Sequence, residues 1–218
     1  MMGTRVMSGT FRHAPEFERR NDMIEATLDC IADQGIEATT VRAVAARAGV
    51  SNGLIRHHFA TKDNLIKEAY RRTIDLMTRP ALEVAASGSG EPEQRLVRFV
   101  EACLSGQVAD PRLLSVWATF ISQVHYSEQI AKEHHAGYAN FRRATERIIK
   151  DVLQAGGRQL KDSELEYYGI VVNALIDGIW LEGCLADDFD ATRQIGICLK
   201  AIEAMIGVEL PASCKTGK

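Results

Sequence analysis

Hydrogen-bond donors gather in one short segment in the first third of the chain. Asn52, Arg56 and His57 share one face of an expected helix, and each can donate to a phosphate oxygen or a base edge. Leu54, Ile55 and Phe59 fall on the other face, which can be buried. A helix of seven or eight residues is roughly 11 Å long, and the major groove of B-DNA is ~12 Å wide. The segment therefore predicts a reading helix, beginning near Asn52, that lies in the major groove of DNA.

A second short helix is needed to position the reading helix. Thr40 can cap it, and Gly49 follows its last periodic residue, where a chain leaving a helix often needs a positive φ. Ser51 can then cap the reading helix. The apolar face of this second helix consists of Val41, Val44, Ala45 and Ala48. Two short helices joined by a tight turn form a helix-turn-helix.

A longer helix precedes this pair and is expected to pack across it. This helix is expected to run from Phe17 to Gln34, and Gly35 is expected to end it. Its apolar stripe consists of Met23, Ile24, Thr27, Leu28 and Ile31. Arg19 and Arg20, at its start, either approach the DNA backbone or lie in solvent.

The segment from Thr40 to Leu65 resembles the DNA-binding domain of TetR-family transcriptional regulators. One position departs from that family, because Arg56 stands where the family most often carries a phosphate-contacting tyrosine. The matching positions are Thr40, Val41, Val44, Ala45, Ala48, Gly49, Val50, Ser51, Gly53, Ile55, His58, Phe59, Lys62 and Leu65. So many matches in register are a specific signal.

The resemblance implies two kinds of DNA contact. Residues that match Thr40, His58 and Lys62 contact phosphates in the family and so position the protein, whereas the exposed face of the reading helix is better placed to select bases. The predicted DNA contacts are Thr40, Arg42, Ser51, Asn52, Gly53, Leu54, Arg56, His57, His58 and Lys62.

Charge is distributed unevenly along the 218 residues. The net charge is −3, which does not by itself suggest a nucleic-acid-binding protein. However, residues 36–80 hold eight Lys and Arg against four Asp and Glu, and residues 81–218 hold 14 against 19. A basic amino-terminal part on an acidic body fits an electrostatic footprint confined to one end.

The five cysteines show no metal-binding spacing. The chain has neither a continuous membrane-spanning run nor a signal peptide. We therefore expect a cytoplasmic protein with reduced thiols.

The rest of the chain predicts only helices, with no alternating strand pattern. Pro80 is expected to kink or break a helix over 62–85, and the segment SGSGEP at 87–92 is the clearest break in composition. Further helices are expected over 92–108, 111–125, 128–155, 163–185 and 190–207. The predicted fold is all-α: a flexible tail (1–16), a three-helix helix-turn-helix DNA-binding domain (17–62), and a roughly six-helix effector-binding and dimerisation domain (63–210). This plan also resembles that of the TetR family.

The last two helices predict a homodimer. Residues 168–186 are apolar almost all round, and such a helix must be covered on every side. A second copy of the chain is the simplest cover, with burial inside one thick monomer as the alternative. In the family, the two final helices of each subunit form a four-helix bundle. The residues expected at the dimer interface are Tyr168, Val172, Leu175, Ile176, Ile179, Ile195, Leu199 and Ile202.

The run Leu175–Glu182 resembles the carboxyl-terminal domain of BetI-type repressors, the choline-responsive branch of the family. This resemblance implies a small-molecule effector, with a choline-like cation as the leading candidate. A quaternary ammonium binds to aromatic faces and a carboxylate, although aromatic residues at helical spacing also occur as ordinary core, and Asp177 could instead lie at the dimer seam. The candidate pocket residues are Trp117, Phe120, Tyr138, Phe141, Asn173, Asp177 and Trp180.

No pattern in the sequence predicts catalysis, a metal or a cofactor. His134 and His135 are adjacent, so their side chains diverge by about 100° on a helix, and a solvated face explains them better than a metal site. The sequence contains no nucleophile elbow, phosphate loop or HExxH motif. We therefore expect a regulator, most simply a repressor, that binds a palindromic operator as a homodimer and is released by an effector. A helical ligand-binding protein that has lost DNA binding is the alternative, and an enzyme that uses the body cavity is a third possibility.

Overall fold

The computed structural model describes residues 16–213 apart from 89, 107, 109 and 187–189. These residues form nine helices and no strand, which confirms the all-α prediction. The helices are α1 (Glu16–Ala38), α2 (Val41–Ala48), α3 (Asn52–Phe59), α4 (Lys62–Ala86), α5 (Pro92–Cys103), α6 (Pro111–Ile121), α7 (Glu128–Ala155), α8 (Asp162–Leu185) and α9 (Ala191–Ile206). The predicted tail, except Glu16, lies outside the described residues.

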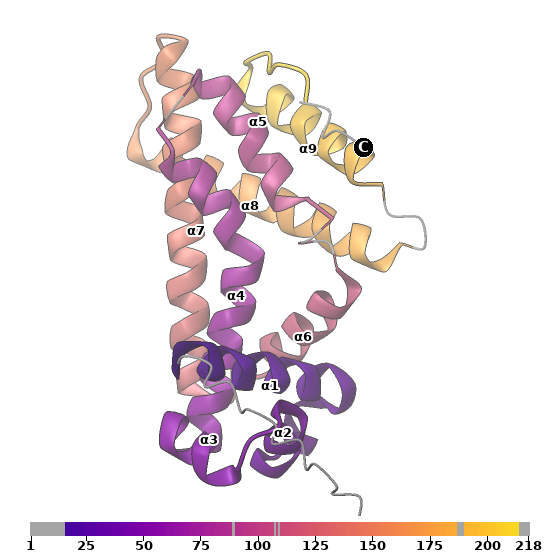
Figure 1. Cartoon of the computed structure of the whole chain (residues 1–218). Coiled ribbons are helices and arrows are strands. Elements are labelled where there is room, and N and C mark those ends of the chain that lie inside the picture. Colours follow the sequence, from indigo (N-terminus) through magenta and orange to yellow (C-terminus); the bar gives the residue numbers. More distant parts are fainter. Residues whose placement is uncertain (1–15, 89, 107, 109, 187–189, 214–218) are drawn as a thin grey trace, which may run out of the picture.

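The molecule has a small head and a longer body (Figure 1). Helices α1–α3 form the head at one end, and α4 and α7 run side by side from the head into the body. Helices α5, α8 and α9 pack at the far end, while α6 returns toward α1. Helix α4 therefore belongs to both parts, since its first turns support α3 and its later turns line the body.

Local capping explains why the head helices begin and end where they do. The hydroxyl of Thr40 accepts a hydrogen bond from the Ala43 amide at 3.1 Å, and that of Ser51 accepts one from the Leu54 amide at 3.2 Å. Gly49 adopts the left-handed conformation, with φ of 66°, that closes α2. These caps were the ones expected from the sequence.

Some helix ends differ from the expectation. The backbone at Gly35 is non-helical, with φ of 77° and ψ of 171°, but helical residues resume beyond it and α1 ends at Ala38. Helix α4 continues through Pro80. Helix α5 ends at Cys103 and α6 at Ile121, several residues before the predicted ends, because the chain there forms hydrogen-bonded turns instead of further helix.

Three apolar clusters hold these helices together. The head cluster joins α1, α2, α3 and the start of α4 around Met23, Val44 and Phe59. The junction cluster joins α1, α4, α6 and α7 around Ile31, Tyr70, Phe120 and Ile130. The body cluster, which is the largest, fills the space among α4, α5, α7, α8 and α9. The junction cluster therefore lies between the head and the body and packs against helices of both.

Ion pairs cross the boundary between head and body. Arg20 of α1 pairs with Glu68 of α4 at 2.7 Å, and Glu25 of α1 pairs with Arg72 of α4 at 2.7 Å. Asp29 of α1 pairs with Arg112 of α6. Partly exposed pairs of this kind contribute little stability individually, but together they fix the direction in which α1 lies across α4 and α6.

Helix α8 is long and apolar enough, by length and composition alone, to cross a membrane. Half of its apolar stretch is buried inside the chain. The core helix of a soluble protein passes the same test, and the packing of α8 on α7 and α9 is of that kind.

Candidate DNA-reading surface and ligand pocket

The reading helix α3 presents its polar face outward. Ile55 and Phe59 are 1% and 4% exposed and belong to the head cluster, so they fix the rotation of the helix about its own axis. Asn52, Arg56 and His57 are exposed on the remaining face. That face can therefore meet a base edge or a phosphate without any change in the packing of the head.

The other predicted DNA contacts surround this face. Thr40, Arg42, Ser51 and Gly53 are also exposed, while Leu54, His58 and Lys62 are half-buried. The structure contains no DNA, so the assignment of these contacts stays a prediction. Lys62 has a structural partner as well, because its Nζ donates to the carbonyl oxygens of Ile36 at 3.2 Å and Glu37 at 3.5 Å. This amine secures the end of α1 against α4.

Two arginines near the reading helix are engaged within the chain. The guanidinium of Arg20 pairs with Glu68 and lies over the ring of Phe59, 5.2 Å from its centre. Arg47 pairs with Asp33 at 2.5 Å. The sequence left two roles open for Arg20, a contact to the DNA backbone or a position in solvent. In the structure its side chain instead holds α1 against α3 and α4.

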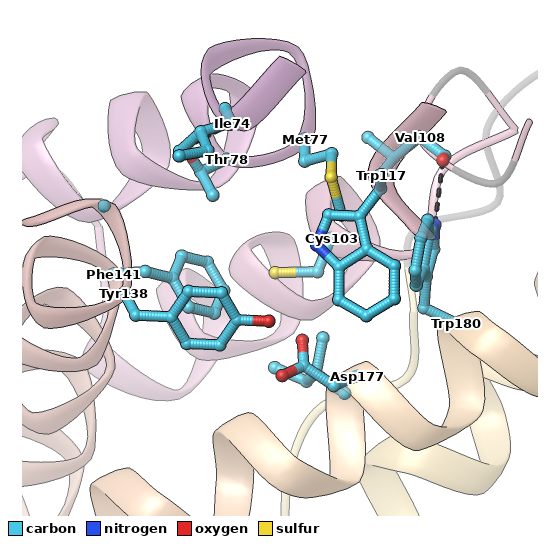
Figure 2. Close-up of a pocket in the computed structure, with 12 residues that line it drawn as sticks. Ile74, Met77, Thr78, Cys103, Val108, Trp117, Tyr138, Phe141, Asp177 and Trp180 are labelled. Atoms are coloured by element: carbon cyan, nitrogen blue, oxygen red, sulfur yellow. Dashed lines mark hydrogen bonds between the residues drawn. The ribbon is translucent and has the colours of Figure 1, made fainter. Parts of the chain in front are cut away.

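The body contains a pocket bounded by α4, α5, α6, α7 and α8 (Figure 2). Its cavity volume is about 50 Å³, and the figure rises to about 560 Å³ only when the open space at its mouth is included. Its lining residues are Ile74, Met77, Thr78, Cys103, Val108, Trp117, Gly137, Tyr138, Phe141, Ile176, Asp177 and Trp180. Most of these side chains are apolar, and a few polar atoms point into the space.

Aromatic rings form two walls of this pocket (Figure 2). Trp117 and Trp180 meet edge to face, with ring centres 5.5 Å apart, and the Trp180 indole donates to the carbonyl oxygen of Val108 at 2.8 Å. Tyr138 and Phe141 of α7 lie opposite them. The chain has only these two tryptophans, so both report on the same pocket.

Asp177 is the one carboxylate among the lining residues, and no lining residue is basic. Burial raises the pKa of Asp177 to about 6, and the hydroxyl of Tyr138, which points toward the carboxylate, partly opposes that rise (Figure 2). Burial, followed by the charge of Asp177, raises the pKa of Tyr138 as well, so this hydroxyl stays protonated. The pocket is therefore apolar and carries at most one negative charge.

Two predicted pocket residues do not line this cavity. Phe120 is fully buried in the junction cluster, with its ring centre 4.7 Å from that of Tyr70. Asn173 is buried between α7 and α8, where its Oδ1 accepts a hydrogen bond from the Thr145 hydroxyl at 2.8 Å. Each side chain lies on a part of its helix that faces a neighbouring helix and not this cavity.

The sequence reasoning missed several lining residues. Ile74, Met77 and Thr78 lie on α4, and Cys103 lies on α5, neither of which was considered for the pocket. Their residue types give no signal of ligand binding in the sequence, since apolar helix positions normally indicate core. Only the convergence of five helices identifies them.

Seven of the eight residues predicted at the dimer interface are buried within the single chain, and the structure contains no second copy, so the interface stays a prediction. Helix α8 is apolar on all sides, and its hydrophobic pattern could not show which side the chain itself covers. Tyr168, Val172, Ile176, Ile179, Ile195, Leu199 and Ile202 are each at most 9% exposed within the single chain. Leu175 is half-buried against the same cluster.

Other apolar side chains of α8 and α9 are exposed instead. Tyr167, Ile170 and Leu181 are 57%, 43% and 40% exposed on α8, Leu185 is 70% exposed at its end, and Ile197 is 46% exposed on α9. We call these five residues the outer face of α8 and α9. They are the side chains that an external partner can cover.

The reading helix, its capped partner and the helical body with its aromatic pocket together define the class of the protein, a helix-turn-helix DNA-binding protein. Comparison with known proteins agrees. Residues 23–69 match the family of bacterial regulatory proteins called tetR, and residues 92–207, more than half of the chain, match the family described as BetI-type transcriptional repressor, C-terminal. The chain belongs to the TetR family of transcriptional regulators and has a BetI-type carboxyl-terminal domain.

Individual relatives support this assignment. The HTH-type transcriptional regulator BetI of Burkholderia thailandensis is 28% identical over 189 residues, covering 86% of this chain and 93% of the relative. A crystal structure of a transcriptional regulator from Pseudomonas aeruginosa PAO1 shares 32% identity and a TM-score of 0.81, covering 91% of this chain and 95% of that one. A regulator from Saccharomonospora viridis, solved in complex with choline, shares 23% identity and a TM-score of 0.69, covering 86% and 97% respectively.

Proposed function

We propose that this protein is a cytoplasmic repressor that binds a palindromic operator as a homodimer and leaves it when a choline-like cation enters the pocket. The observation that carries the proposal is the pocket lining. Aromatic faces attract a quaternary ammonium through their quadrupoles, and a carboxylate balances its charge. Trp117, Trp180 and Tyr138 supply such faces around Asp177 in a cavity with no basic side chain among its lining residues.

The charge of the lining also predicts which ligands are rejected. A zwitterion such as glycine betaine would bring a carboxylate into a pocket that has no cationic partner for it, and burying an unpaired charge is costly. We therefore expect choline to bind more tightly than betaine. The choline complex of the Saccharomonospora viridis protein is consistent with this expectation and concerns that protein alone.

The dimer is proposed to form through the outer face of α8 and α9. Exposed apolar side chains cost free energy in water, and a second copy of the same face can cover them with twofold symmetry. Two reading helices, one from each copy, could then reach half-sites one helical turn, ~34 Å, apart. One reading helix of eight residues makes too few contacts for a specific site.

Ligand binding is tested with the tryptophans as the probe. Choline is titrated into the free protein, and 3,3-dimethylbutan-1-ol, which has the same shape without the charge, is titrated in parallel. Asp177→Asn should weaken choline binding about tenfold or more and leave the neutral alcohol unaffected, because only the cation needs the carboxylate. Glu166→Gln, which removes an exposed carboxylate from the same helix, should change neither affinity.

DNA binding is tested by selecting duplexes from a random-sequence pool with the full-length protein. The proposal predicts enrichment of an inverted repeat, salt-dependent binding, and release by choline at concentrations that occupy the pocket. Failure to enrich any duplex at low ionic strength would favour the alternative, a ligand-binding protein without DNA binding. Release by glycine betaine but not by choline would contradict the proposed effector.

A further inference from the structure

A tyrosine and a histidine connect α4 to α7 close to the pocket, beside the Arg71–Glu133 pair of the same two helices. The Tyr70 hydroxyl lies 2.9 Å from Nδ1 of His134. Neither residue lines the pocket. The Tyr70 ring is fully buried in the junction cluster, which also holds residues of α1 and α6. The bond therefore joins a helix of the pocket wall to the apolar cluster that supports the head.

The surroundings of Tyr70 make this bond expensive to lose. The junction cluster that surrounds the Tyr70 ring consists of apolar side chains, which accept no hydrogen bond from its hydroxyl. Burial raises the pKa of Tyr70 to about 12, which keeps the hydroxyl protonated at neutral pH. Burial and the neighbouring His135 lower the pKa of His134, which keeps its ring neutral. With the imidazole proton on Nε2, Nδ1 accepts from Tyr70, and separation of the two residues would leave a buried donor without a partner.

His134 is also packed against a pocket residue. His134 and Tyr138 are four residues apart on α7, and their ring centres are 4.4 Å apart. The hydroxyl end of the Tyr138 ring points into the pocket toward Asp177 (Figure 2). A ligand that lies between Tyr138 and Asp177 therefore presses on the ring against which His134 rests.

Close packing of α4 and α7 at the next turn strengthens the link. Gly137 faces Ile74, and a Cβ atom at position 137 would lie 2.8 Å from Cγ2 of Ile74. The two helices can approach this closely only because residue 137 has no side chain. Ile74 is one turn beyond Tyr70 on α4, so the hydrogen bond and the close contact lie in successive layers of one helix pair.

We propose that the Tyr70–His134 hydrogen bond couples ligand binding in the pocket to the position of α4, and through the junction cluster to the reading head. When a ligand moves Tyr138, His134 moves with it. Tyr70 must then follow, shifting α4 relative to α1, or lose its hydrogen bond to His134. Tyr70 and His134 are positioning residues that act through Tyr138 and touch neither ligand nor DNA. The inference rests on the proposed function, since it concerns how that function's two sites communicate.

The test separates coupling from affinity. Choline affinity is measured by tryptophan fluorescence in the free full-length protein and again with saturating selected duplex. The ratio of the two dissociation constants is the coupling, which by thermodynamic reciprocity equals the factor by which choline weakens DNA binding. Tyr70→Phe removes only the hydroxyl, and His134→Phe keeps a ring against Tyr138 but removes the nitrogen. Glu133→Gln, which breaks the neighbouring Arg71–Glu133 pair between the same helices, and Glu166→Gln on α8 are the matched controls.

We expect each of the two test variants to reduce the ratio at least threefold while changing the choline affinity of the free protein less than twofold. The double variant should lower the ratio no further than the single ones, because both remove the same bond. The controls should keep the ratio of the unmodified protein. An unchanged ratio in both test variants, or additive losses in the double variant, would overturn the inference alone. A ratio of one in the unmodified protein would overturn the proposed function and the inference together.

Discussion

Replacing Asp177 by Asn should stabilise the protein in the absence of ligand. The carboxyl group has an ordinary pKa of 3.8 and a pKa of about 6 in the folded chain, because burial penalises its charged form. At ~1.4 kcal/mol per pH unit, this difference corresponds to a cost of about 3 kcal/mol at neutral pH. An Asn of similar shape has no charge to bury, but it needs hydrogen bonds of its own. We therefore expect a gain of about 1–3 kcal/mol.

The sign of the pH dependence follows from the raised pKa. The folded chain binds the proton of Asp177 more tightly than the unfolded chain does, so this residue favours folding below pH 3.8. This favourable contribution to folding is lost as the pH rises from about 4 to 6, and above pH 6 the folded chain bears the full cost of burying the charged carboxylate. The stability difference between Asp177→Asn and the unmodified protein should accordingly be largest above pH 6 and small near pH 4.

Thermal unfolding at a fixed protein concentration measures this difference. For a chain of this size, each kcal/mol corresponds to roughly 2–4 °C, so Asp177→Asn should unfold about 2–12 °C higher at pH 7.5. Choline at a hundred times its dissociation constant should stabilise the unmodified protein by ~2.7 kcal/mol and the variant far less. A variant that melts below the unmodified protein at pH 7.5 without choline, or that choline stabilises as much as the unmodified protein, would refute the assignment of Asp177 as the carboxylate that binds the cation.

Three further predictions concern the reading helix, the outer face and the helix contact beside the pocket. Arg56→Ala should weaken binding to the selected duplex by ~1–3 kcal/mol and relax the preference at one base of each half-site. The control Arg143→Ala, on the exposed side of α7, should do neither. Equal losses of affinity on all duplex sequences would instead make Arg56 a phosphate contact. Ile170→Glu should convert the dimer into monomers, measured by light scattering, because it would bury a carboxylate in the proposed interface. Tyr126→Glu, at a residue that is 85% exposed and lies outside the outer face of α8 and α9, should leave the mass unchanged. If the Ile170→Glu variant stays dimeric, the interface lies elsewhere. Gly137→Ala should destabilise the fold by about 1–3 kcal/mol in denaturant unfolding, because its Cβ would clash with Ile74. Adding Ile74→Ala in the same chain should recover most of the lost stability. If Gly137→Ala has no effect on stability, α4 and α7 can separate freely.

The sequence predicted the head more fully than the body, for a physical reason. Caps and turns depend on residues close together in the sequence, so Thr40, Gly49 and Ser51 predict where the head helices begin and end. The structure has the helix ends at these residues. In the body the decisive question is which neighbour covers each side chain. Helix α8 is apolar on every side, and its pattern could not distinguish Val172, which the chain itself buries, from Ile170, which it leaves exposed.

The pocket shows the same limit. Trp117 and Phe120 are three residues apart on α6, and sequence spacing favoured neither, yet only Trp117 lines the cavity. The Tyr70–His134 bond joins residues 64 positions apart, and adjacent histidines in a polar helix indicated a solvated face. Long-range pairs of this kind are decided by how whole helices pack, which single-sequence patterns do not contain.

The junction cluster has a practical consequence for protein engineering. Chimeric biosensors are often made by fusing the effector domain of one regulator to the DNA-binding domain of another. In this protein such a fusion cannot simply be cut between α3 and α4, because Leu28 and Ile31 of α1 are packed among Val116 and Phe120 of α6. A hybrid that keeps the ligand response must retain these side chains of α1, together with Asp29 opposite Arg112, whatever recognition sequence its foreign helices contribute.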